Sequence, residues 1–119
     1  HAQSPPFAQS KLVQVLTGAV LDIAVDLRRG SPWYGTFVTA ELSAENWSQI
    51  LIPAGFAHGF CTLTANTAVI YKVTAPYSAK DDGGILWNDP ALNIPWPTTA
   101  AAAIVSDKDR QLPALADYD

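Results

Sequence analysis

Cysteine, histidine and basic residues are all scarce in this sequence, and each shortage argues against a class of protein. A single cysteine, Cys61, excludes an intrachain disulfide and indicates a reducing compartment. Seven lysines and arginines stand against eleven aspartates and glutamates, and the net charge of −4 argues against nucleic acid or an anionic membrane surface as the main partner. No apolar run is long enough to span a membrane and no signal peptide is visible, so we expect a cytoplasmic protein.

The residues that are present suit one folded domain. The 119 residues are 49% hydrophobic and 15% charged, which is enough apolar material to bury a core. No internal repeat or linker divides the chain. We therefore expect a single domain over residues 1–119.

Short segments rich in apolar and β-branched residues, about five residues long and about ten residues apart, alternate with glycine- and proline-containing turns. Within one segment, apolar residues alternate with Asp22, Ala24 and Asp26, which predicts a strand with one apolar and one more polar face. After residue 75 the chain reads as irregular, and Ser106 predicts the cap of a short helical turn. The pattern predicts an all-β sandwich or barrel. The expected strands are at 11–16, 21–28, 36–42, 49–52, 59–63 and 68–74, with a brief further one at 85–87.

The densest motif is Pro-Ala-Gly-Phe-Ala-His at residues 53–58. Pro53 suits the end of a strand because it removes a backbone donor, and Gly55 allows conformations that other residues avoid. The pattern Pro-x-Gly-x-x-His resembles the second signature of the cupin barrels. Together with the strand spacing, it predicts an all-β, cupin-type jelly-roll β-barrel with a short irregular or helical C-terminal segment. Barrels of this kind hold ligands in an open mouth lined by inward side chains.

The shortage of histidine bears on the chemistry of such a barrel. Metal-binding cupins usually supply a His-x-His pair and a glutamate before the second motif, but residues 20–25 contain no histidine, and only His1 and His58 exist. We therefore expect no metal site. The remaining acids and bases suit proton abstraction beside a carbonyl group, as in epimerisation. The candidates are His1, Lys11, Asp22, His58, Tyr71, Lys72, Tyr77 and Asp109.

Motifs spread along the whole chain together resemble the dTDP-4-dehydrorhamnose 3,5-epimerase family. They include His-Ala-Gln at 1–3, Gln-Ser-Lys-Leu-Val at 9–13, Asp-Ile-Ala-Val-Asp-Leu-Arg at 22–28 and Gly-Ser-Pro at 30–32. Further ones are Leu-Ser-Ala-Glu-Asn at 42–46, the 52–60 turn, Tyr-Lys at 71–72, Gly-Ile-Leu-Trp-Asn-Asp-Pro at 84–90 and Ser-Asp-Lys-Asp at 106–109. The resemblance implies epimerisation at C3 and C5 of dTDP-4-keto-6-deoxyglucose through enolate intermediates, in the supply of dTDP-L-rhamnose.

The resemblance also implies roles for individual residues. His1 matches the family's base, and Asp109 matches the carboxylate that orients it. Lys11 matches the lysine that stabilises the enolate, and Tyr71 the proton donor on the opposite face.

The expected contacts with the nucleotide sugar are made by Gln3, Lys11, His58, Asp82 and Lys108. The family more often has glutamate where Asp82 stands. The reaction needs no cofactor, because the ketone already acidifies the neighbouring C–H bonds.

The sequence departs from the family at its start. The Arg-Gly-Leu that precedes the family's base is missing, as are the preceding strands, so we expect an N-terminally incomplete chain. A homodimer is the family expectation. Two alternatives stay open: an epimerase acting on one carbon in another deoxysugar pathway, and a non-catalytic fragment that binds nucleotide sugars. A metal-dependent cupin ranks third.

Overall fold

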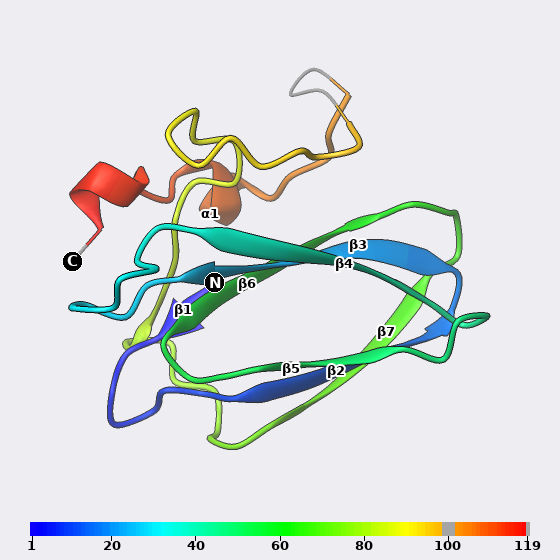
Figure 1. Ribbon diagram of the computed structural model, residues 1–119, viewed down its shortest axis with the longest axis horizontal. Helices are drawn as coiled ribbons and strands as arrows, with labels where there is room; N and C mark the ends of the chain where they lie inside the picture. Colours follow the sequence, from blue (N-terminus) through cyan, green and yellow to red (C-terminus); the bar gives the residue numbers. More distant parts are fainter. Residues whose placement is uncertain (99–101, 119) are drawn as a thin grey trace.

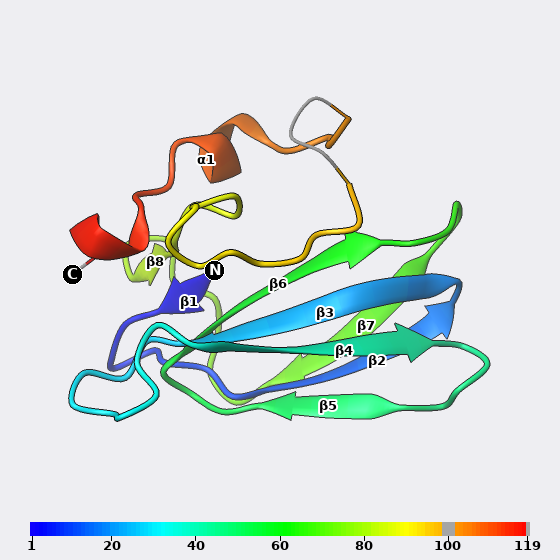
Figure 2. The same cartoon turned by 45° about the horizontal axis from the view of Figure 1, so that its top comes forward.

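The computed structural model describes residues 1–98 and 102–118. Two three-stranded antiparallel sheets face each other, and a long irregular segment lies over one of them (Figures 1 and 2). One sheet has the order β5-β2-β7, with β2 at Lys11–Thr17, β5 at Gln49–Ile52 and β7 at Ala68–Val73. The other has the order β4-β3-β6, with β3 at Ala19–Asp26, β4 at Phe37–Ser43 and β6 at Phe56–Thr62. A small third sheet joins β1 (Ala2–Gln3) to β8 (Asp82–Gly83).

The main core lies between the two larger sheets. Alternate residues of each strand point inward, as the period of two along a strand requires. The inner side chains are at most 3% exposed and consist of Val13, Val15, Val20, Ala24, Leu42 and Ile52. The prediction of an all-β sandwich is confirmed, and the strand expected at 49–52 has those bounds. The strand expected at 59–63 begins earlier, at Phe56, because pairing with β3 extends as far as the Asp26–Phe56 pair.

A second apolar cluster covers the outer face of the β4-β3-β6 sheet. Ile23 and Val25 of β3 pack there against residues of the C-terminal segment, including Ile85 and Leu92. The predicted division holds, with Ile23 and Val25 on one face of β3 and the two aspartates on the other, but both faces are buried. Asp22 and Asp26 are 0% and 2% exposed. The strand expected at 85–87 is wrong: Ile85 serves as a packing residue of the covering segment and not as part of a sheet.

The covering segment ends in two short helices, α1 (Asp107–Arg110) and the 3₁₀ turn η1 (Leu115–Asp117). Ser106 caps α1, since its side-chain oxygen accepts a hydrogen bond from the backbone nitrogen of Asp109 at 3.1 Å. This confirms the predicted cap. The cap matters because α1 carries Asp109, which lines the cavity described below.

Asp26, at the end of β3, accepts four hydrogen bonds through its buried carboxylate. Oδ1 accepts from the backbone nitrogen of Arg28 at 2.9 Å and from its Nε at 3.0 Å. Oδ2 accepts from Nη2 of Arg28 at 2.9 Å and from Oγ of Ser31 at 2.7 Å. The Arg28 guanidinium also lies over the ring of Phe56, 4.9 Å from its centroid. This group of four residues, the Asp26 clasp, ties the end of β3 to the next turn and to the start of β6.

The turn between β5 and β6 depends on Gly55, whose φ is +92°. A Cβ at this position would lie 2.6 Å from Cγ of Arg28, which the Asp26 clasp holds in place. We expect Gly55→Ala to lower the free energy of unfolding by about 2–3 kcal/mol, from backbone strain and steric overlap together. Urea unfolding measures this loss.

Gly30→Ala is the matched control for this prediction. Gly30 also has a positive φ, +83°, but no atom of the described residues lies within 4 Å of the point that a Cβ would occupy there. We expect a loss of only about 1 kcal/mol in this variant, from backbone strain alone. Equal losses in the two variants would contradict the role given to Arg28.

Candidate active site

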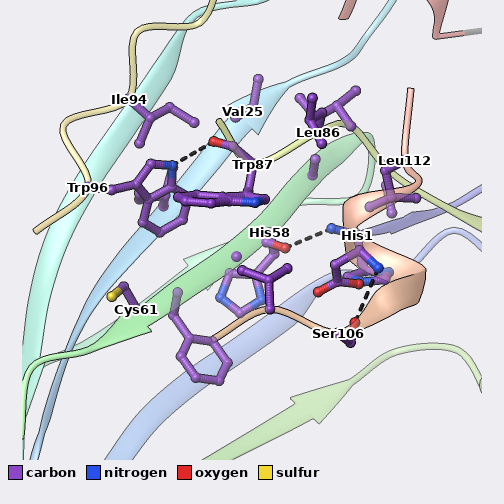
Figure 3. A pocket seen from close by; sticks show the side chains of 18 of the residues that line it. His1, Val25, His58, Cys61, Leu86, Trp87, Ile94, Trp96, Ser106 and Leu112 are labelled. Atoms are coloured by element: carbon purple, nitrogen blue, oxygen red, sulfur yellow. Dashed lines mark hydrogen bonds and ion pairs between the residues drawn. The ribbon is translucent and has the colours of Figure 1, made fainter. Parts of the chain in front are cut away.

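A cavity of about 900 Å³ opens beside the outer edge of β6 and reaches the space between the two sheets. Its size falls in the range of small-molecule binding sites. Figure 3 shows part of its wall, with residues of β6, the N-terminal segment and the C-terminal segment around the opening. Of the residues expected to form the site, all but Lys108 line this cavity, namely His1, Gln3, Lys11, His58, Tyr71, Asp82 and Asp109.

His1 is fixed to β6 by its backbone. Its nitrogen donates to the carbonyl oxygen of His58 at 2.8 Å, and the nitrogen of His58 donates to the carbonyl oxygen of His1 at 2.9 Å (Figure 3). Residues that exchange hydrogen bonds in this way are directly opposed, and their side chains project from the same face. The register places His58 opposite Ala24, an inner core residue. Both imidazoles therefore belong to the inner face.

The ring of His1 is paired with Asp109 of α1. Nε2 of His1 and Oδ1 of Asp109 are 2.5 Å apart, although the two residues are 108 positions apart in sequence. An ionised carboxylate only accepts hydrogen bonds, so this contact places the proton of a neutral His1 ring on Nε2. The lone pair of Nδ1 is then available as a base.

Asp82 lies beside the other nitrogen of the same ring and is itself paired with Lys108. Oδ2 of Asp82 is 3.6 Å from Nδ1 of His1 and accepts a hydrogen bond from Nζ of Lys108 at 2.7 Å. This bond raises the pKa of Lys108 above its ordinary value. Lys108 is thus brought to the site through Asp82, which offers an acceptor next to the free nitrogen of His1.

Lys11 and Tyr71 approach from the opposite sheet. Both belong to the inner face, since Tyr71 is paired with the core residue Val13 and Lys11 with the core residue Ile52. Nζ of Lys11 lies 6.0 Å from the centre of the Tyr71 ring. Burial lowers the pKa of Lys11 below its ordinary value, although the negative charges of Asp82 and Asp22 oppose this shift. The cavity thus has a base on one wall and a cation with a phenol on the other.

Gln3 is held by the backbone of two loops. Its Nε2 donates to the carbonyl oxygens of Phe7 at 2.7 Å and Pro76 at 3.1 Å, and its Oε1 accepts from the nitrogen of Ser78 at 3.0 Å. These contacts occupy both amide hydrogens and the amide oxygen. Gln3 therefore shapes the cavity by joining its loops, and a direct contact with a ligand remains a prediction.

Asp22, one of the candidate acids of the sequence, has a partner that the sequence does not reveal. Nε2 of His58 lies 2.7 Å from Oδ1 of Asp22, and both side chains are buried. Asp22 is opposite Phe60 and His58 is opposite Ala24, so the two are diagonal neighbours on one face. The signal that could have revealed the pair is the register between two strands, which the sequence does not state.

Neither a metal-binding cluster nor a membrane-spanning helix is present in the described part of the chain. In residues 1–98 and 102–118, no group of three or more histidine, cysteine, aspartate or glutamate side chains is placed to hold a metal ion. Over the same residues, no helix is long and apolar enough to cross a membrane.

Comparison with known proteins identifies the family of this chain. The sequence model of the dTDP-4-dehydrorhamnose 3,5-epimerase family matches residues 1–117. The chain belongs to this family. The dTDP-4-dehydrorhamnose 3,5-epimerase of Sinorhizobium fredii is 55% identical over 117 residues, which cover 98% of this chain and 60% of that protein.

Solved structures show the same family relationship. The Bacillus anthracis dTDP-4-dehydrorhamnose 3,5-epimerase, crystallised with TDP and pyrophosphate, is 54% identical, with a TM-score of 0.91 over 95% of this chain and 63% of that one. The dTDP-6-deoxy-D-glucose-3,5-epimerase of Legionella pneumophila, in complex with dTDP-4-keto-L-rhamnose, is 42% identical, with a TM-score of 0.92 over 98% of this chain and 62% of that one. These matches confirm the cupin-type jelly roll predicted from the sequence. The chain spans about 60% of the length of these relatives.

Proposed function

We propose that this protein is a dTDP-4-dehydrorhamnose 3,5-epimerase, acting without a cofactor on C3 and C5 of dTDP-4-keto-6-deoxyglucose. The observation that carries the proposal is the placement of the His1–Asp109 pair, Lys11 and Tyr71 around one cavity, although they come from four separate parts of the chain. Membership of the epimerase family supports the choice of substrate.

In this proposal each group takes the role that the resemblance to the family implies. Nδ1 of His1 removes a proton from the carbon beside the C4 ketone, while Asp109 stabilises the imidazolium that forms. The electrons of the broken C–H bond move to the ketone oxygen, and the ammonium of Lys11 stabilises the resulting enolate. Tyr71 then donates its phenolic proton to the opposite face of the same carbon. Exchange with solvent returns a proton to Tyr71 and removes one from His1, so the enzyme ends as it began.

Asp82 and Lys108 fit a substrate-binding role in this scheme. Asp82 lies beside the nitrogen of His1 that takes the proton, where its carboxylate can accept from a sugar hydroxyl group, and Lys108 donates to that carboxylate. His58 and Gln3 belong to the same proposal as expected contacts of the nucleotide sugar. The expected homodimer, the cytoplasmic location and the rhamnose pathway are likewise part of it.

Deuterium exchange tests this proposal directly. In D₂O, the protein is expected to introduce deuterium at both C3 and C5 of dTDP-4-keto-6-deoxyglucose, observed by NMR. Tyr71→Phe is expected to lower net epimerisation by about two orders of magnitude, because it removes the proton donor. Exchange at one carbon only would replace the proposal by a single-carbon epimerase. Binding of dTDP without any exchange would replace it by a non-catalytic nucleotide-sugar-binding protein.

A further inference from the structure

Asp22 is a fully buried carboxylate on the inner face of the β4-β3-β6 sheet, where its neighbours along β3 are the core residues Val20 and Ala24. Oδ1 contacts Nε2 of His58, but Oδ2 is buried and has no hydrogen-bond partner among the described residues. A buried polar atom without a partner costs stability, and an apolar residue would fill this position at a lower cost. The acid therefore needs an explanation other than packing.

The surroundings of Asp22 supply that explanation. Asp22 does not itself line the cavity, but two basic groups near it do. It contacts His58 directly, and its charge, with that of Asp82, opposes the lowering of the Lys11 pKa by burial. A ligand in the cavity would meet His58 and Lys11 and not Asp22. Any effect of Asp22 on the ligand is exerted through these two groups.

The contact with Asp22 determines which nitrogen of His58 can meet a ligand. An ionised carboxylate accepts and cannot donate, so it holds a proton on Nε2 of His58. Nδ1 is the nitrogen left for another partner. His1 has the same arrangement, with Nε2 against Asp109. The backbone exchange between His1 and His58 places these two histidine–aspartate pairs side by side on one face.

We propose that Asp22 is a positioning residue, which holds His58 in its Nε2–H tautomer and fixes its ring so that Nδ1 addresses a polar group of the sugar nucleotide. This inference rests on the proposed function, because it takes the occupant of the cavity to be that substrate. It adds a second carboxylate-oriented imidazole to the site: His1 removes protons, and His58 holds the substrate in line for their removal.

Nitrogen-15 NMR of the histidine rings tests the tautomer. In the unmodified protein, Nε2 of His58 is expected to carry the proton and Nδ1 to lack a bonded proton when the ring is neutral. Asp22→Asn keeps the shape of the side chain but allows its amide nitrogen to donate to Nε2, which moves the proton of a neutral ring to Nδ1. Finding the Nδ1–H tautomer in the unmodified protein would overturn the proposal without the use of any variant.

Kinetics of the same variant test the consequence. Asp22→Asn is expected to lower kcat/KM about 100-fold, as for a substrate held out of line, while the signals of His1 stay in place. Asp26→Asn is the matched control, because Asp26 lies on the same strand and face, is almost as deeply buried and contacts Arg28 and Ser31 instead of a histidine. It should lose stability without changing the tautomer of His58.

The two proposals fail in different ways. An unmodified protein that exchanges no substrate protons, yet holds His58 as Nε2–H and loses that tautomer in Asp22→Asn, would remove the epimerase function and keep the positioning of His58. Normal exchange with an unchanged His58 spectrum and unchanged kcat/KM in Asp22→Asn would remove the role of Asp22 alone.

Discussion

Replacing Asp109 by asparagine is expected to lower kcat by about three to four orders of magnitude while dTDP still binds. Asparagine can turn its amide nitrogen toward Nε2 of His1, which is 2.5 Å from Oδ1 of Asp109 in the unmodified protein. The proton of a neutral ring then moves to Nδ1, and the lone pair that would remove the substrate proton is lost. The carboxylate that stabilises the imidazolium is lost as well.

Steady-state kinetics together with dTDP titration measure this effect. Asp107→Asn is the matched control, since Asp107 is an exposed aspartate in the first turn of the same helix, away from His1. It should leave kcat within about twofold of the unmodified protein, because exposed substitutions away from a site have small effects. A normal kcat in Asp109→Asn would remove the His1–Asp109 pair from the mechanism.

The second large effect is expected on stability, from Asp26→Asn. The carboxylate is 2% exposed and accepts four hydrogen bonds, three of them from Arg28. Hydrogen bonds to a charged group contribute about 1.5–3 kcal/mol each when buried, and the solvent exposure of Arg28 reduces that amount here. We expect the free energy of unfolding at pH 7 to fall by about 2–3 kcal/mol in urea titrations.

The same variant predicts a change in pH dependence. The side-chain hydrogen bonds from Arg28 hold the pKa of Asp26 well below its usual range, against the opposing effect of burial. A carboxyl whose pKa is lower in the folded state stabilises the fold above its unfolded pKa, about 3.9, and loses that contribution as the pH falls further. The difference in stability between the unmodified protein and Asp26→Asn should therefore shrink below about pH 4. A difference that stays constant from pH 7 to pH 3 would contradict this assignment.

The strand pattern could be predicted from the sequence because alternation and turn residues are local signals. The strands at 11–17 and 49–52 follow from β-branched residues that end at Thr17–Gly18 and at Pro53. The burial of Asp22 and Asp26 could not be predicted in this way, because two aspartates four residues apart give the same sequence pattern on a buried strand face and on a solvent-exposed one. Asp22 and Asp26 lie on the face of β3 that the opposite sheet buries, and the covering segment buries the other face. The prediction for Ile85 was wrong for a related reason: a short apolar run can lie in a sheet or cover one.

The site likewise contains residues that could be predicted from the sequence and contacts that could not. His1, Lys11, Tyr71 and Asp109 were predicted through the resemblance to a family, and the structure brings them to one cavity. The contact between His58 and Asp22 depends on the pairing of two strands, and the engagement of Gln3 depends on two loops that only the folded chain brings together. Contacts between residues that are distant in sequence cannot be predicted from local sequence patterns.

The 108-residue separation of His1 and Asp109 determines when, during synthesis and folding, this pair can form. A ribosome delivers a chain from its N-terminus at about 5–20 residues per second, and contacts that are distant in sequence form late because they close a long loop. Every strand of both large sheets precedes α1 in the sequence. A nascent chain can therefore assemble the strands that form the walls of the cavity before Asp109 has been synthesised. Under the proposed function, the newly synthesised protein is expected to remain inactive until α1 docks, so the onset of activity would mark completion of the fold.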